Sequence, residues 1–379
     1  MTAKMDMSRW EFLQCCVAGF GCLAANPIGA DETQQRVESD DNQSRWEERE
    51  PATLDLREFI LWIREVYGPS VRILPLERKY MSAPGMKENA LYGVADMACI
   101  LYTIDDLDDS DAERWQWARA FAEFQESTTG WFREHPPQSL SREHNTAFVL
   151  GAMQLLSLRP EIPVILEEQY ENISEFLRNL HWRYGMYQDS HRGAGIGSIR
   201  VLVPSLHDSS WFLRYFAECD RLFDPNNGMM GQAKPKRGDI DQIGGTFHYA
   251  FLYEYFNRRM PYPEARVNAI LGLQRPDGYW DPDNRLWMTL DAIYLMTRTV
   301  RYHTHRINDV KASVKRALAA LQRDVYSQEG RRKVFDADSG VHSLTAAISV
   351  VAEAQHFLGA GTVRTDWPLK LVLDRRPFI

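Results

Sequence analysis

The stretch "QRPDGYWD", Gln274–Asp281, ends an apolar helical pattern with a glutamine, a turn and an aromatic pair. A looser copy of it, "QESTTGWF", occurs at Gln125–Phe132. Pro276, Asp277 and Gly278 form turns because proline fixes φ, aspartate hydrogen-bonds its own backbone and glycine tolerates positive φ. The recurrence of this turn at the end of two helical patterns indicates a chain built from internal repeats.

The segments between these turns have the period of helices. From residue 54 onward, apolar residues recur at intervals of three and four, and alternating β-branched runs are nearly absent. Segments with one polar face, such as "DAERWQWARAFAEFQ" at 111–125, alternate with segments that are apolar on most sides, such as "EHNTAFVLGAMQLL" at 143–156. An amphipathic helix can face water, whereas a helix that is apolar all round must be buried. The sequence therefore predicts that outer and inner helices alternate along the chain.

The spacing of the inner helices predicts the number of pairs. Small residues or their substitutes align in five of them, at Met97, Ala147, Ala250, Ala292 and Ala346. The interval from the second to the third is about twice the others, and the glycine-rich segment His191–Val203 supplies a sixth inner helix there. Outer helices are expected near residues 54, 111, 164, 207, 262 and 309. Six stacked pairs predict an all-α fold, an (α/α)6 toroid, within a domain at 54–379.

The pattern of glutamine, Asp-Gly turn and tryptophan, followed by a helix that contains Thr-Ala, resembles the repeats of terpenoid cyclases and protein prenyltransferases. The resemblance extends over roughly residues 54–360 and implies an α/α toroid. The layout is also similar to the toroids of polysaccharide lyases and glycosidases. A shared fold supports architecture better than activity.

The N-terminus has the features of a leader. An apolar run at Cys15–Ala25 follows Arg9 and precedes small residues up to Ala30, a pattern typical of a signal peptide and too short to span a bilayer. "SRWEFLQ" resembles the twin-arginine export motif, although Trp10 replaces the second arginine. We expect residues 1–30 to be a signal peptide and the protein to be exported, periplasmic or secreted. An uncleaved amphipathic start is the alternative.

The segment that follows the leader, residues 31–53, contains eight acidic and three basic residues. It is too polar to bury enough apolar surface, so we expect a disordered acidic linker. It carries most of the net charge of -8, and the rest of the chain has no basic stripe. We therefore expect no nucleic acid partner and no stable membrane span.

Polar and ionisable residues recur at the predicted N-termini of the inner helices. In a toroid these termini meet at one mouth of the central cavity, where free N–H groups and helix dipoles favour anionic ligands. Four histidines at equivalent positions favour a functional site there. The predicted catalytic residues are His144, Asn145, His191, His248 and Tyr249, and the predicted substrate-binding residues are Tyr92, Arg192, Trp287, His342, Trp131 and Trp280.

Other motifs predict no metal and no cofactor. A zinc site would need a cysteine at the predicted mouth, and Cys99 and Cys219 both lie inside helical patterns away from it. "DDLDD" at Asp105–Asp109 contains the acidic motifs of terpene synthases, but it follows the end of an inner helix and is expected to cap the next outer helix. "GAGIGS" at Gly193–Ser198 lacks the strand and lysine of a phosphate loop.

The predicted site favours an exported carbohydrate-active enzyme, either a polysaccharide lyase or a glycoside hydrolase, because the export signal occurs together with turns rich in Trp and Tyr. A lyase needs a base for the proton beside a uronate carboxylate and groups that neutralise the developing charge. His248 or Tyr249 fits the role of base or acid. The neutralising groups are His144, Asn145 and Arg192.

A glycoside hydrolase needs two carboxylates across the scissile bond. Asp96 and Asp291 occupy equivalent inner-helix positions, where a structural role is the alternative. The family resemblance implies a third possibility, an isoprenoid-handling protein of the terpenoid cyclase type, and a non-catalytic ligand-binding toroid is the fourth. The expected partner is a small molecule or an oligosaccharide.

Overall fold

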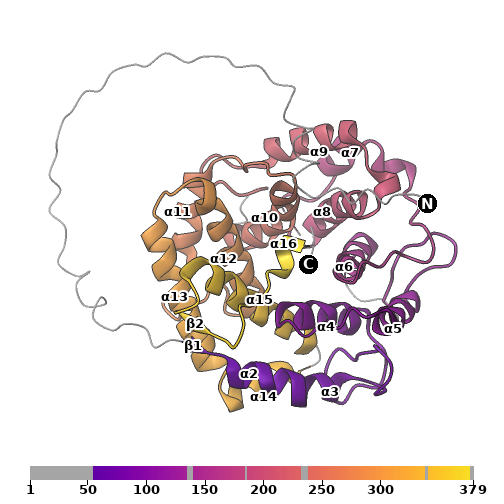
Figure 1. The fold of residues 1–379 in the computed structure, drawn as a ribbon. Coiled ribbons are helices and arrows are strands. Elements are labelled where there is room, and N and C mark those ends of the chain that lie inside the picture. The colour runs from indigo at the N-terminus through magenta and orange to yellow at the C-terminus, as the bar shows by residue number, and fades with distance from the viewer. Residues whose placement is uncertain (1–53, 135–139, 184–185, 232–237, 338–339, 376–379) are drawn as a thin grey trace, which may run out of the picture. The chain divides into compact units, whose positions relative to one another are not determined.

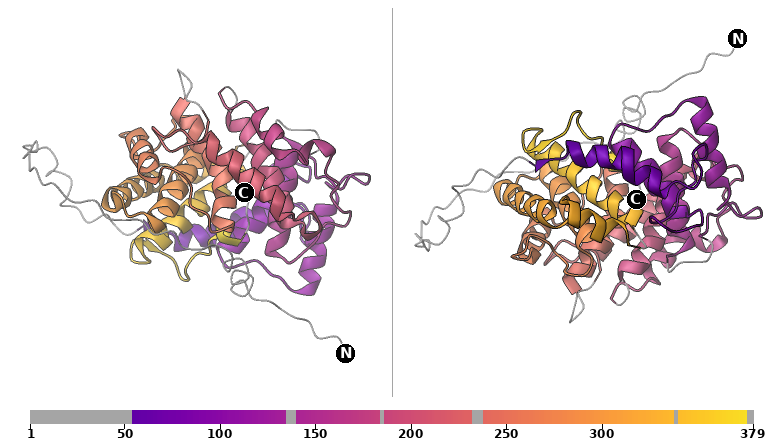
Figure 2. Two further views of the ribbon diagram at one scale, coloured as in Figure 1. Left: turned by 90° about the horizontal axis from the view of Figure 1, so that it is seen from above. Right: turned by 90° about the horizontal axis from the view of Figure 1, so that it is seen from below.

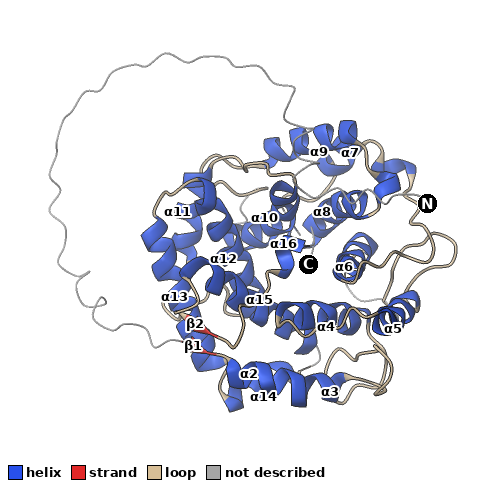
Figure 3. Ribbon diagram, in the orientation of Figure 1, coloured by secondary structure: helices blue, strands red, loops and turns tan. Residues whose placement is uncertain are grey.

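Helices make up nearly all of the regular structure. The computed structural model describes residues 54–134, 140–183, 186–231, 238–337 and 340–375. Within them the fold is all-α, as predicted, and the strands β1 (Leu54–Asp55) and β2 (Val363–Arg364) form one short parallel pair (Figure 3). The signal peptide predicted at residues 1–30 and the linker predicted at residues 31–53 lie outside the described residues.

Six helices are buried along most of their length. They are α4 (Leu91–Thr103), α6 (Arg142–Leu155), α8 (Met186–Leu202), α10 (Gly238–Tyr255), α12 (Arg285–Tyr302) and α15 (Gly340–Leu358). Each of these helices contacts the next along the chain, and α15 contacts α4, so the series of contacts returns to its start (Figure 1). The inner helix predicted at His191–Val203 is α8, which begins five residues earlier than expected.

The helices with exposed faces lie outside these six helices (Figures 1 and 2). α5 packs on α4, α11 packs on α10 and α12, and α13 packs on α12 and α15. The helices found near the predicted outer positions are α2 (Arg57–Trp62), α5 (Asp111–Ala122), α7 (Ile173–Arg178), α9 (Ser209–Leu222), α11 (Pro263–Leu273) and α13 (Ile307–Asp324). The first predicted outer helix, Leu54–Gly68, also contains η1 (Ile63–Tyr67). Elements without a predicted counterpart are α3 (Gly68–Val71), η2 (Glu168–Tyr170), η3 (Pro204–Leu206), α14 (Gln328–Phe335) and α16 (Val372–Arg375).

The repeated turn is held by its glutamine. Gln274 Nε2 donates to Gly278 O at 3.0 Å and to Ser313 O of α13 at 3.0 Å. The earlier turn has the same pair of bonds, from Gln125 Nε2 to Gly130 O at 2.9 Å and to Ile162 O at 2.6 Å. Both glycines have positive φ, which other residues rarely adopt. The motif recurs because it ties each turn to the next outer segment.

The glycine-rich run in α8 serves helix packing. A Cβ on Gly195 would lie 2.6 Å from the backbone oxygen of Glu143 in α6. A Cβ on Gly193 would lie 2.0 Å from the hydroxyl of Tyr249 in α10. These glycines let α8 approach both neighbours closely, which brings α6, α8 and α10 together.

Candidate functional site

Three of the predicted histidines lie together, and we call them the histidine cluster: His144 on α6, His191 on α8 and His248 on α10. The ring centroid of His191 is 4.4 Å from that of His144 and 4.1 Å from that of His248. All three residues are buried, with 3–4% of their surface exposed. The close approach of the three helices therefore concentrates imidazole groups at one place.

Tyr92 on α4 joins the cluster to Asn145. Its hydroxyl lies 2.8 Å from His144 Nδ1 and donates to Asn145 Oδ1, also at 2.8 Å. A phenol has a single proton, so His144 donates to Tyr92 through Nδ1–H when Tyr92 donates to Asn145. Burial raises the pKa of Tyr92 well above its usual value, and the nearby acids Glu134 and Asp96 raise it further. The hydroxyl therefore keeps its proton at neutral pH.

A second hydrogen-bond chain orients His248. Ser190 Oγ donates to Tyr187 O at 2.6 Å and lies 2.9 Å from His248 Nδ1. Because the Ser190 hydroxyl donates its proton to the backbone oxygen of Tyr187, it accepts from His248, which therefore carries a proton on Nδ1. Burial, with a smaller contribution from a neighbouring histidine, lowers the pKa of His191 to about 3 and holds the pKa of His248 well below its usual value. Both rings are therefore neutral at neutral pH.

His342 on α15 and Trp287 on α12 extend the site. Their ring centroids are 4.2 Å apart, and the ring of His342 is 5.1 Å from that of Tyr92. His342 Nδ1 lies 2.9 Å from Asp96 Oδ2 on α4. The structure thus brings together seven of the predicted site residues: His144, Asn145, His191, His248, Tyr92, Trp287 and His342.

Two predicted residues lie next to the cluster in sequence but not in space. Tyr249 packs against Gly193, with its ring 5.6 Å from Trp182 and 6.1 Å from Tyr215, and it is fully buried. Successive residues of a helix are rotated by about 100° around its axis, so Tyr249 faces away from the histidine beside it. Arg192 lies 3.3 Å from Glu143 Oε1 in an ion pair.

The two tryptophans of the repeated turns, which were predicted to bind substrate, also lie outside the histidine cluster. The indole N–H of Trp131 donates to Ile165 O at 2.9 Å, and that of Trp280 donates to Ile270 O at 2.8 Å. Both side chains have no exposed surface. A buried indole has no face to offer a sugar ring, so both tryptophans hold the turns in place rather than bind substrate in this conformation.

Glu134 is a member of the site that the sequence reasoning missed. Its Oε1 accepts from the backbone N–H of Leu91, at the start of α4, at 3.1 Å, and its Oε2 is buried with no hydrogen-bond partner. Burial raises its pKa to about 7. A signal was present, because an acidic residue follows the aromatic turn in both "GWFRE" and "GYWD". Tyr187 and Ser190, in the first turns of α8, were missed as well.

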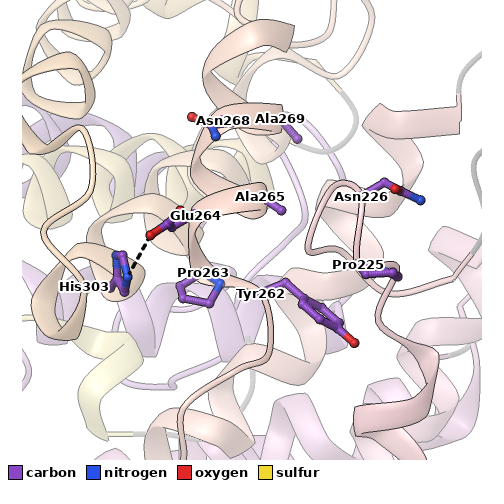
Figure 4. Close-up of a pocket in the computed structure, with 9 residues that line it drawn as sticks. All are labelled: Pro225, Asn226, Tyr262, Pro263, Glu264, Ala265, Asn268, Ala269 and His303. Carbon is purple, nitrogen blue, oxygen red and sulfur yellow. Dashed lines mark ion pairs between the residues drawn. The ribbon is translucent and has the colours of Figure 1, made fainter. Parts of the chain in front are cut away.

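A separate groove of about 770 Å³ lies beside α11. Figure 4 shows Tyr262, Glu264 and Asn268 along it, with His303 facing Glu264. His303 Nε2 is 3.4 Å from the Glu264 carboxylate. None of the predicted site residues lines this groove, and it forms no part of the candidate site.

Other expectations can be compared with the described residues. Among them, no group of three or more His, Cys, Asp or Glu side chains is arranged to hold a metal ion. Their helices include none with the length and apolar character needed to cross a membrane. Asp108 Oδ1 accepts from the backbone N–H of Ser110 at 2.8 Å in a turn immediately before α5. Ser110 is the N-cap residue of α5 and no side chain caps this helix, so the cap expected from "DDLDD" is not formed. Comparison with family models, curated proteins and solved structures gave no match.

Proposed function

We propose that the six buried helices and their outer partners form an (α/α)6 toroid, and that an active site lies at the N-terminal halves of α4, α6, α8, α12 and α15 together with the middle of α10. The cyclic order of contacts from α4 to α15 and back to α4 supports this arrangement. Helix N-termini favour negative charge. An anionic substrate, or a reaction that develops negative charge, suits such a site.

The proposed activity is that of a polysaccharide lyase acting on a uronate. His191 Nδ1, which is buried and has no hydrogen-bond partner, takes the proton from the carbon beside the substrate carboxylate. The electron pair forms the new C=C bond as the glycosidic C–O bond breaks. Tyr92 gives its proton to the leaving oxygen, and Asn145 donates through its amide to the negative charge that develops on the carboxylate.

One observation carries this proposal. The hydroxyl of Tyr92 lies 2.8 Å from both His144 Nδ1 and Asn145 Oδ1, so a protonated phenol is held between an imidazole that can return its proton and an amide that fixes its direction. A tyrosine needed only for packing would not require two such partners at the end of a buried helix. The neutral imidazole of His191, whose ring centroid is 4.4 Å from that of His144, provides the complementary base.

The test is a screen against uronate-containing polysaccharides, with the ultraviolet absorbance of the unsaturated product as the readout. We expect Tyr92→Phe to reduce the rate by about 100-fold to 10,000-fold, because a general acid or base contributes about that much. Tyr249→Phe should retain most of the rate, since its hydroxyl faces α8. Tyr92→Phe activity equal to that of the wild type would exclude the assigned role.

A glycoside hydrolase is the second candidate, favoured by two buried carboxyl groups. Asp96 and Asp291 lie on α4 and α12, and each has buried oxygen without a hydrogen-bond partner. A hydrolase would produce new reducing ends without the ultraviolet absorbance. An isoprenoid-handling protein or a non-catalytic toroid would give neither product.

We also propose that the protein acts after export, because the apolar run of the leader ends in small residues before Ala30. The intact mass of secreted protein should lack residues 1–30. Full-length chain retained in the cytosol would remove the argument for an extracellular polysaccharide.

A further inference from the structure

A cleft of about 600 Å³ lies beside the candidate site, and the proposed elimination does not use it. The cleft is found where the turn before α12 meets the end of α13, the helix α14 and the start of α15. Its lining includes Trp287 and also Ser343, the residue that follows His342. Trp287 therefore belongs both to the cleft and to the candidate site, so a ligand in the cleft contacts the site through this ring.

The indole ring of Trp287 forms an apolar part of the cleft wall. His342 packs on one face of the ring, with the two centroids 4.2 Å apart and the planes inclined at 33°. Trp287 is partly exposed, whereas Trp131 and Trp280 have no exposed surface. The rest of the Trp287 ring is therefore accessible from the cleft. An aromatic surface with a few fixed polar groups around it suits a sugar ring, which has an apolar face and a belt of hydroxyls.

Arg285 and Asp324 give the cleft hydrogen-bonding groups in fixed positions. The Arg285 guanidinium lies over the Tyr279 ring, 5.3 Å from its centroid, and Nε donates to Pro282 O at 3.2 Å. Within the described residues this is the only hydrogen bond of its side chain, so both Nη groups keep N–H bonds for a ligand. Arg323 holds the Asp324 carboxylate by donating to its two oxygens at 2.7 and 2.6 Å. Each of these oxygens can accept a further hydrogen bond.

The charges that line the cleft are balanced. The basic side chains are Arg285, Arg323 and Lys333, and the acidic ones are Asp283, Asp324 and Glu329. A cleft of this kind has no excess of one charge that would attract an anion in preference to a neutral molecule. Its acids and bases suit hydroxyl groups, because a hydroxyl can donate to a carboxylate and accept from a guanidinium.

We propose that this cleft is a subsite that binds one pyranose unit of the substrate chain, beyond the bond that breaks, whether or not that unit carries a carboxylate. The inference rests on the proposed function, because it adds a subsite to the same active site. The sugar ring packs on Trp287, and its hydroxyls bind the Arg285 guanidinium and the Asp324 carboxylate. His342 links Trp287 to Tyr92, the proposed proton donor, since its ring centroid is 5.1 Å from that of Tyr92. The bound unit thus holds the chain close to the reacting groups.

Methyl β-D-glucopyranoside and methyl β-D-glucuronide, which differ only in a carboxylate, test the proposal when each is titrated into the full chain. The readout is the NMR signal of the Trp287 indole N–H, assigned by its loss in Trp287→Phe. We expect both sugars to shift this signal, with dissociation constants within about 3-fold of each other, because the cleft charges are balanced.

Arg285→Ala should weaken the binding of both sugars by about 10-fold or more, because it removes a charged hydrogen-bond donor. Arg275→Ala is the matched control and should change binding by less than about 2-fold. The Arg275 side chain is about as exposed as that of Arg285, and it lies 3.4 Å from the Asp277 carboxylate, but it does not line the cleft.

The outcomes separate the subsite from the proposed reaction. A Trp287 signal that neither sugar shifts, or equal effects of Arg285→Ala and Arg275→Ala on binding, would overturn the subsite. Binding of only one of the two sugars would also overturn it, because the cleft would then select for or against a carboxylate. Both sugars bound as expected, without any cleavage of polyuronates, would contradict the lyase and leave the subsite standing. Circular dichroism of each variant confirms that it folds.

Discussion

Glu134 illustrates how burial sets the chemistry of a single residue. Its ordinary pKa of 4.5 is raised to about 7, mainly by burial. Between these two values the unfolded chain has lost the proton that the folded chain still holds, so stability falls as pH rises through this window. Below the window the group is neutral in both states, and above it the loss is complete.

Glu134→Gln should remove this pH dependence. The amide keeps the oxygen that accepts from Leu91 N–H but cannot ionise. At pH 8 the variant should be more stable than the wild type by about 1–2 kcal/mol, allowing for partial solvent screening, and at pH 5 the difference should shrink below about 1 kcal/mol. Urea unfolding of the variant and the wild type at both pH values measures this difference in the free energy of unfolding. An equal stability difference at pH 5 and pH 8 would show that ionisation of Glu134 is not the cause. Glu161→Gln, at an exposed position, is the control.

At the residue scale the sequence predicted which histidines meet, and the reason is the repeat. His144, His191 and His248 lie on consecutive inner helices, so a count of repeats was enough to bring them together. Their places within the helices differ: they are the third residue of α6, the sixth of α8 and the eleventh of α10, so His248 is not at a helix start as expected. Tyr249 could not be placed in the same way, because one residue further along a helix the side chain points about 100° away. Hydrogen bonds such as that of Ser190 depend on helix rotations that no sequence pattern fixes.

At the element scale, local chemistry made the turns predictable. Proline, aspartate and glycine specify a turn within four residues, whereas the start of α8 was placed five residues late. Its first residues, Met186–Ser190, carry little apolar periodicity, and the helix there is held by contacts with its neighbours. The role of the turn glutamine also required the structure, because Ile162 and Ser313 are distant from it in sequence.

Gln274→Ala tests the role of the turn. The change removes the two bonds to Gly278 O and Ser313 O and leaves these carbonyl groups without their donor. It also removes the bonds that Gln274 Oε1 accepts from the side chains of Ser313 and Arg316. We expect a loss of about 1–3 kcal/mol in the free energy of unfolding. Gln322→Ala, at an exposed position of α13, should change it by less than about 0.5 kcal/mol. Equal effects of the two substitutions in chemical denaturation would contradict the structural role of the motif.

At the scale of the whole helical unit, a buried ion network joins α12, α15 and α16. Arg298 on α12 has no exposed surface and pairs with Glu353 on α15 and Asp374 on α16. Arg298 also lies 4.0 Å from Glu254 on α10. Sequence patterns could not predict this network, because its four members come from separate elements. It holds the C-terminal helix against the inner helices.

Arg298→Met should lower the free energy of unfolding by about 3–5 kcal/mol, because it leaves Glu353 buried without its counter-charge. The double variant Arg298→Met with Glu353→Gln should recover part of that loss, as the remaining group is then neutral. Arg301→Met is the matched control, since Arg301 is half exposed and its pair with Glu254 is 3.8 Å apart. A control as damaging as Arg298→Met would show that the loss comes from packing and not from the buried charge.

The central claim, that the inner-helix site carries out elimination rather than hydrolysis, is tested most directly by mass spectrometry of products formed in ¹⁸O-labelled water. Elimination breaks the C–O bond without adding water, whereas hydrolysis adds one water at each cleavage. For a polyuronate cleaved by the wild type, we predict unsaturated products without ¹⁸O from the cleavage itself, and loss of these products in Tyr92→Phe. Saturated products that carry one ¹⁸O per cleavage would contradict the lyase and favour a hydrolase.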